Sequence, residues 1–178
     1  MDKLIIQYPK SIPSVLCEEI IYKFEETKQE TSNKLEIPKQ NEEWEKIERI
    51  IYKELVNKIY DYKKKILINM NKNETEKLLL LLNKKMIINS FMIQKYKAEN
   101  IETIIDNYNR VNNRCNVLTY VFFLNTVSDS GEIIFTNGTV IKPENGKLVL
   151  FPDNLNYLFK CKLSINDQYI ISGQLYNI

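Results

Sequence analysis

The stretch Lys142-Pro143-Glu144-Asn145-Gly146-Lys147-Leu148-Val149-Leu150-Phe151-Pro152 carries the signal that decides the fold class of this chain. Its first part, Pro143 to Gly146, favours a tight turn, because proline fixes φ and glycine tolerates positive φ. The residues from Lys147 to Phe151 then form an apolar run of the kind found in strands. A turn that leads directly into an apolar strand is typical of β-sandwiches and jelly rolls.

Short runs rich in Val, Ile, Tyr, Phe and Thr recur throughout the second half of the chain. Turn residues such as Asn137-Gly138 separate them, and this alternation predicts a series of short strands. The predicted strands are Met86–Lys97, Val117–Asn125, Glu132–Phe135, Thr139–Ile141, Lys147–Phe151, Tyr157–Leu163 and Gln168–Tyr176. Their number and spacing favour a jelly-roll core over residues 86–178.

The first half has the apolar spacing of helices. Residues 13–27, 42–65 and 73–82 are predicted helices, and residues 28–41 a polar surface loop. The clearest apolar stripe comprises Trp44, Ile47, Ile51, Leu55, Ile59 and Tyr62, and we expect it to pack against a sheet. A short strand at Leu4-Ile5-Ile6 precedes the helices. The sequence therefore predicts one α+β domain over 1–178, in which residues 1–85 are mainly helical support for the jelly-roll core.

Composition narrows the classes of function. The chain has 178 residues, 25 basic and 23 acidic, so its net charge of +2 predicts no nucleic-acid partner. The longest aliphatic run, Leu78–Leu82, is too short to span a membrane, and the N-terminus does not resemble a signal peptide. The scattered Cys17, Cys115 and Cys161 are typical of reduced thiols. These features predict a cytoplasmic protein with no membrane span.

Abundant Lys, Asn, Ile and Tyr with only 4 Gly and 5 Pro are typical of an AT-rich genome. That bias suggests a large DNA virus or an AT-rich parasite as the source. If the source is viral, the expected location is the host cytoplasm or the virion.

The chain contains 0 histidines. This absence excludes Ser-His-Asp and Cys-His catalysis and the usual histidine-bearing zinc sites. No phosphate-binding Gly-Lys-Ser/Thr loop and no Gly-x-Gly-x-x-Gly motif is present either.

Several segments, in order, resemble motifs of the prolyl 4-hydroxylase-like family of iron- and 2-oxoglutarate-dependent oxygenases. Residues 142–152 are similar to its KPKKGxLLxFP segment, and 117–125 to its vLTxxxYLN strand. Residues 130–135 resemble GGExxF, 166–173 resemble NDKYIITGW, 93–96 resemble the strand that enters the site, and 16–20 fit the opening helix. The resemblance implies a double-stranded β-helix, which is the jelly-roll core of these enzymes.

The resemblance also implies where a metal site would lie. The family holds Fe(II) with a His-x-Asp pair and a second histidine. In this chain Ile104 stands at the first histidine position and Asp106 at the carboxylate position. The second histidine falls on Phe159, or on Tyr157 if the loop differs in length. We therefore interpret Ile104, Asp106 and Phe159 as vestigial metal-site positions, and Asp106 as a solvated loop carboxylate.

The cosubstrate site departs from the family in a similar way. The basic residue that pairs with the far carboxylate of 2-oxoglutarate falls on Gln168, and a neutral amide cannot form that charge-assisted pair. Tyr96 remains at a position where the family often hydrogen-bonds 2-oxoglutarate, although without that ligand it is most simply a half-buried strand aromatic. We interpret Tyr96 and Gln168 as vestigial 2-oxoglutarate-site positions.

Two classes of function follow. The favoured one is a catalytically inactive pseudoenzyme, with no cofactor and no bound metal, that acts through protein–protein interaction. Its partner would be a host prolyl hydroxylase or another protein, or copies of itself in a scaffold or virion. The alternative is an active oxygenase with a remodelled metal site, in which the thiolate of Cys161 or Cys115 replaces histidine.

Overall fold

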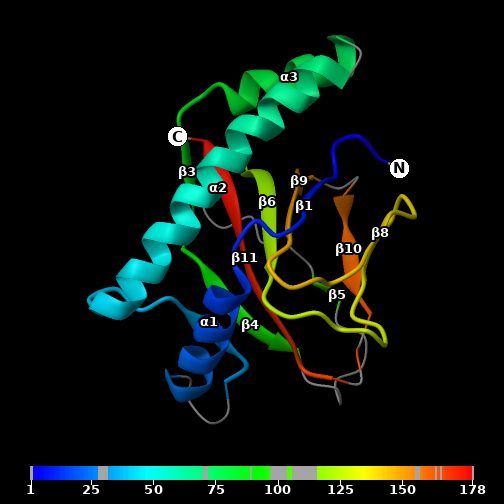
Figure 1. Cartoon of the computed structure of the whole chain (residues 1–178). Helices are drawn as coiled ribbons and strands as arrows, with labels where there is room; N and C mark the ends of the chain where they lie inside the picture. Colours follow the sequence, from blue (N-terminus) through cyan, green and yellow to red (C-terminus); the bar gives the residue numbers. More distant parts are fainter. Residues whose placement is uncertain are drawn as a thin grey trace.

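The computed structural model describes residues 2–27, 32–69, 72–88, 90–96, 104–105, 116–154, 157–162, 164 and 166–177. Three helices occur in these ranges: α1 (Ser14–Thr27), α2 (Glu42–Asn69) and α3 (Lys72–Leu82). The strands are β1 (Ile6–Tyr8), β2 (Lys34–Glu36), β3 (Met86–Ile88), β4 (Met92–Tyr96), β5 (Ile104–Ile105), β6 (Asn116–Phe123), β7 (Ile133–Phe135), β8 (Val140–Ile141), β9 (Leu148–Pro152), β10 (Phe159–Cys161) and β11 (Gln168–Asn177). Figure 1 shows the long helix α2 crossing over the strands. Within the described ranges, no helix is long and apolar enough to cross a membrane.

Two antiparallel sheets form the core. The larger sheet has the strand order β1-β9-β6-β11-β4-β2, and β3 pairs with the C-terminal end of β11. The smaller sheet has the order β5-β10-β7-β8. From β6 onward the chain passes repeatedly from one sheet to the other, so that β6, β9 and β11 lie in the large sheet, whereas β7, β8 and β10 lie in the small one. This winding is the double-stranded β-helix that the sequence predicts.

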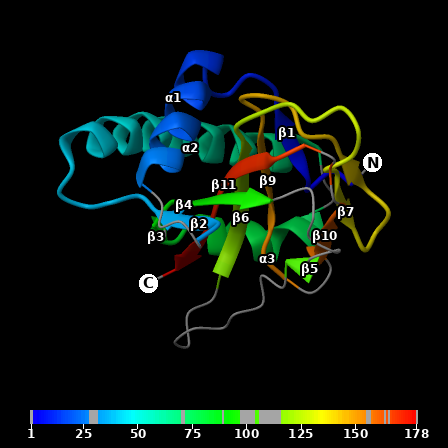
Figure 2. The ribbon, with the colours of Figure 1, turned by 90° about the horizontal axis from the view of Figure 1, so that it is seen from below.

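The alternation of side chains along β6 divides the apolar core into two parts. Leu118, Tyr120 and Phe122 pack with the buried faces of the helices. Val121 and Phe123 point the other way, toward the small sheet. Figure 2 shows α1 and α2 along one side of the large sheet. We call the apolar space between the sheets the inter-sheet core; it comprises Ile5, Val121, Phe123, Ile133, Phe135, Ile141, Val149, Phe151, Phe159, Cys161 and Ile170.

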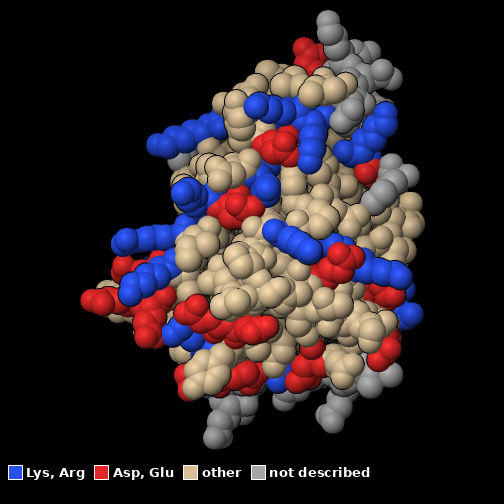
Figure 3. Space-filling view, viewed as in Figure 1, with Lys and Arg blue, Asp and Glu red and all other residues tan. Residues whose placement is uncertain are grey.

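Helix α2 buries the apolar stripe predicted from the sequence, together with Ile66. Its N-terminus is capped by Asn41, whose Oδ1 accepts hydrogen bonds from the amides of Glu43 (3.1 Å) and Trp44 (3.2 Å). Acidic residues occupy its first turn, where the helix dipole favours negative charge. Figure 3 shows acidic side chains gathered at the lower left, where this end of α2 lies.

The fold differs from the sequence prediction in four places, and the first is the opening strand, which was expected at residues 4–6 but is β1 at Ile6–Tyr8. Residues 34–36 were expected in a loop, but they form edge strand β2 against β4. Their pattern of one half-buried leucine between two exposed charges gives little strand signal, and pairing with β4 supplies the structure. The run 86–97 is interrupted at Phe91, whose buried ring packs on Tyr120, and β3 is thereby separated from β4. The two-residue strand β5 was not predicted.

The turn at 143–146 ties the N-terminal segment to the core. Gly146 has a φ of +75°, donates its N–H to the Phe123 carbonyl (2.9 Å) and accepts from the Ile12 amide (3.2 Å). A Cβ at this position would lie 2.2 Å from the Ile12 carbonyl oxygen. Asn145 adds a side-chain hydrogen bond to the Leu124 carbonyl (2.8 Å). Glycine is therefore required here both for its conformation and for the close approach of another backbone segment.

The substitution Gly146→Ala should destabilise the chain by more than about 3 kcal/mol, since it adds a backbone clash to the cost of positive φ. Gly138→Ala is the matched control: its φ is +81°, but no atom lies within 4 Å of the new Cβ, so a loss of about 1 kcal/mol is expected. Denaturant unfolding of both variants measures the difference. Equal losses in the two variants would contradict the proposed role of the Ile12 contact.

Candidate functional site between the two sheets

Phe159 lies at the centre of the inter-sheet core. On β10 it pairs with Ile105 of β5 on one side and with Phe135 of β7 on the other. Its ring centroid is 5.6 Å from that of Phe135 and 5.4 Å from that of Phe151, and those two are 4.9 Å apart. Only 5% of Phe159 is exposed. These three rings, which we call the phenylalanine cluster, fill the space where β7, β9 and β10 face one another.

The structure brings Ile104 onto the strand beside Phe159. The β5–β10 register pairs Ile104 with Lys160, the immediate neighbour of Phe159. The two positions that the resemblance assigns to histidines therefore lie on adjacent strands but not at paired positions: Phe159 pairs with Ile105, so position 105, rather than 104, shares the face of Phe159. The third proposed metal-site position, Asp106, lies outside the described residues, as does Cys115. Tyr157, the alternative to Phe159, packs at the edge of the inter-sheet core and donates its hydroxyl to Asp2 (3.3 Å).

Gln168 opens β11 and is almost fully buried, with 2% exposure. Its Nε2 donates to the Gly131 carbonyl at 3.1 Å, which ties the start of β11 to the loop before β7. Gly131 has a φ of +81°, and a Cβ on it would lie 2.9 Å from the Gln168 Oε1. The Gln168 amide therefore already has a backbone partner within the protein.

Tyr96 lies opposite Gln168 in the β4–β11 register. Its hydroxyl donates to Gln94 Oε1 (3.2 Å), which also accepts from Ser172 Oγ (3.3 Å). Burial, and secondarily the nearby Cys161, raises the pKa of Tyr96 far above its ordinary value. The phenol is consequently a permanent hydrogen-bond donor, and it is already engaged.

Cys161 is buried beside Tyr96 on the inner face of β10. Burial raises the pKa of its thiol to about 12, so the thiolate that would bind a metal is strongly disfavoured. Cys17 is buried as well, and burial raises its pKa to about 11. In the part of the chain that the structure describes, no three His, Cys, Asp or Glu side chains lie together as they would around a metal ion.

Sequence reasoning missed a second polar group at the other end of the inner face. Burial raises the pKa of the Asp153 carboxyl, whereas the side chains of Asn116, Thr119 and Gln174 lower it by a smaller amount. Gln174 lies on the same face of β11 as Gln168, six residues along the strand. Asp153 directly follows the Phe151-Pro152 pair, which is the signal that could have identified it.

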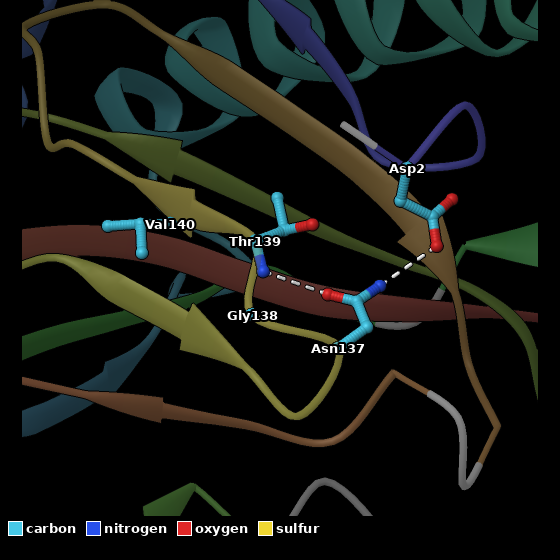
Figure 4. A pocket seen from close by; sticks show the side chains of 5 residues that line it. All are labelled: Asp2, Asn137, Gly138, Thr139 and Val140. Atoms are coloured by element: carbon cyan, nitrogen blue, oxygen red, sulfur yellow. Dashed lines mark hydrogen bonds between the residues drawn. The ribbon is translucent and has the colours of Figure 1, made fainter.

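Two surface hollows lie outside the inter-sheet core. One lies by the β7–β8 turn and is lined by Asp2, Asn137, Gly138, Thr139 and Val140. Figure 4 shows Asn137 donating its amide to Asp2 (2.8 Å) and accepting from the Thr139 backbone N–H (3.0 Å), so these polar groups satisfy one another. The other hollow is a groove between α2 and β3.

This geometry defines the class of protein by fold: a double-stranded β-helix of the prolyl 4-hydroxylase type. The chain is similar to the viral collagen prolyl hydroxylase of Paramecium bursaria Chlorella virus-1, with 14% identity, a TM-score of 0.69 and coverage of 98% of this chain and 91% of that one. It is also similar to a Pseudomonas putida prolyl-4-hydroxylase, with 12% identity, a TM-score of 0.61 and coverage of 98% and 93%. The chain is similar as well to a Trichoplax adhaerens prolyl hydroxylase in complex with a hypoxia-inducible factor peptide fragment, with 15% identity, a TM-score of 0.60 and coverage of 98% of this chain and 84% of that one. No protein-family model and no curated protein matches the sequence.

The described residues do not fit the iron and 2-oxoglutarate that such a fold commonly holds. An Fe(II) centre of this type needs imidazole and carboxylate donors on one face, with open coordination positions. Here a buried phenyl ring occupies the Phe159 position, and two further rings pack against it. The Gln168 amide is neutral and bonded to a carbonyl, so it offers no charged partner to a dicarboxylate.

The two described cysteines should be inert to thiol reagents in the folded protein. In a Cys115→Ser variant, which leaves only Cys17 and Cys161, we expect essentially no reaction with a chromogenic disulfide at pH 8, because burial blocks access and disfavours the thiolate. Unfolding in guanidinium should release both thiols. Rapid labelling under native conditions would show that one of them is accessible.

Proposed function

We propose that this chain is a pseudoenzyme, which keeps the prolyl 4-hydroxylase-like fold and acts by binding protein rather than by oxidation. The observation that carries the proposal is the phenylalanine cluster: Phe159, which the resemblance assigns to a histidine position, packs among other rings in a chain with 0 histidines. A packed hydrocarbon interior gives the two sheets a fixed relative position without a metal. The outer loops and the helical face then remain as the surfaces that can recognise a partner.

The cosubstrate positions support the same proposal. A dicarboxylate such as 2-oxoglutarate needs a cation or several free donors to offset its desolvation. Gln168 is neutral and its amide donates to the Gly131 carbonyl, and the Tyr96 hydroxyl donates to Gln94. The side chains at both positions therefore already bond to other groups of the protein.

The partner in this proposal is a host prolyl hydroxylase, another protein, or further copies of the chain in a scaffold or virion. The Trichoplax adhaerens neighbour holds a peptide fragment of another protein, and so illustrates peptide binding on a related fold. The AT-rich composition supports a large DNA virus as the source, and hence the host cytoplasm as the location. The alternative is an active oxygenase with a remodelled metal site, and a succinate-release assay distinguishes the two.

The chain should release no succinate above background when it is supplied with Fe(II), 2-oxoglutarate and dioxygen, because the described site lacks both imidazole donors and a basic anchor. The assay is run on anaerobically purified protein with added metal. An active prolyl 4-hydroxylase treated identically is the positive control. Uncoupled or substrate-dependent succinate release that rises with protein concentration would contradict the pseudoenzyme proposal.

Restoring the lost donors tests the assigned positions. The triple variant Ile105→His, Phe159→His and Gln168→Lys uses the position that pairs with Phe159, and it should bind Mn(II) and 2-oxoglutarate in calorimetry at least about tenfold more tightly than the unmodified chain. The matched control, Ile105→Gln, Phe159→Gln and Gln168→Lys, introduces polarity at the same places without imidazole. Circular dichroism must show that both variants are folded. No gain in a folded triple variant, or an equal gain in the control, would contradict the assignment of these positions.

A further inference from the structure

Strand β3 has one unpaired edge among the residues that the structure describes. Its other edge pairs with the end of β11, through Ile88 with Leu175 and Met86 with Asn177. β2 pairs with β4 as far as Glu36 opposite Met92, and a hydrogen bond from the Ile37 amide to the Phe91 carbonyl (3.0 Å) extends this pairing by one residue. Among the described residues, no strand pairs with β3 on that side. An unpaired edge with free N–H and C=O groups is a template for pairing with another strand.

The surface beside β3 combines apolar and charged side chains. A groove between α2 and β3 is formed in part by Tyr52, Ile87 and Ile88. Tyr52 is 52% exposed, and Val56, one turn further along α2, is 41% exposed. β3 contains neither proline nor charge, the usual devices that protect an edge strand. Figures 1 and 2 both place β3 at the margin of the molecule, near the C-terminus.

Charges at the two ends of β3 have opposite sign. Lys84 and Lys85 precede the strand and are exposed. At the other end, Glu36 and Glu48 line the groove, together with one cation, Lys39. Such an end-to-end asymmetry is self-complementary when two copies run antiparallel about a two-fold axis. Pairing centred on Ile87 would set Lys84 of each copy opposite Ser90 of the other, next to the two glutamates.

We infer that the β3 edge binds a second copy of this chain, by antiparallel pairing of β3 with β3 about a two-fold axis at Ile87. The inference deepens the proposed binding function by naming its partner as the chain itself. The pairing joins the two large sheets into one continuous sheet, with Tyr52 and Val56 of each copy flanking the junction. Because β3 has only 3 residues, the dissociation constant of the dimer is expected in the micromolar range.

Sedimentation or light scattering between about 1 and 100 µM should show conversion of monomer to dimer. Ile87→Lys should raise the dissociation constant at least about tenfold, since it places like charges directly opposite each other. Val140→Lys is the matched control: Val140 is an exposed apolar residue (50%) on another edge strand, β8, and its replacement should leave the dimer unchanged. A monomer throughout the range, or equal effects of the two variants, would overturn the inference.

Charge reversal tests the register. The double variant Lys84→Glu and Lys85→Glu should weaken the dimer, because it places like charges opposite each other. Adding Glu36→Lys and Glu48→Lys to the same chain should restore the dimer, because opposite charges then face each other again. A folded quadruple variant with no recovery would overturn the pairing about Ile87. The outcome is independent of the succinate assay, so turnover would reject the pseudoenzyme proposal and leave the dimer standing.

Discussion

The contact among Phe135, Phe151 and Phe159 is the interaction on which the rest of this structure depends. Phe151 belongs to β9 of the large sheet, whereas Phe135 and Phe159 belong to β7 and β10 of the small one. The edge-to-face arrangement of Phe151 with both of these rings joins the sheets at one point. Each fully buried ring contributes on the order of 1.5–3 kcal/mol by removal from water. Hydrophobic packing thus links the two sheets across the inter-sheet core.

The two faces of β4 have different surroundings: one faces the helices and the other faces the inter-sheet core. On the helix side, Lys95 bonds to Glu25 of α1 (2.9 Å) and to Asp167 before β11 (2.8 Å). Burial lowers the pKa of Lys95, but the hydrogen bonds of its ammonium with Asp167, Tyr169 and Glu25 raise it by more, so the ammonium stays charged and holds these elements together. The next residue, Tyr96, points inward and bonds to Gln94. The ion-pair network therefore fixes the strand that positions the inner tyrosine.

Much of the fold could be predicted from the sequence because apolar periodicity and turn chemistry are local signals. The stripe of α2 and the turn at Gly146 are examples, since each residue there has the environment that its type favours. Strand β2 could not be predicted, because its pairing with β4 is a long-range contact. At the candidate site, the resemblance gave the position of Phe159, but its neighbours on β7 and β9 are distant in sequence and appear only in the fold. The polar group around Asp153 was missed for the same reason.

We propose that the inter-sheet core is held by its own side chains and requires no metal or cosubstrate. The thermal unfolding midpoint in excess EDTA, compared with that in excess Mn(II) and 2-oxoglutarate, tests this. We expect midpoints that agree within about 1 °C, because a ligand stabilises only a protein to which it binds. Binding at a hundredfold excess over the dissociation constant would add about 2.7 kcal/mol, or about 5–10 °C for a chain of this size. A rise of that order would show that the core does hold a metal or cosubstrate.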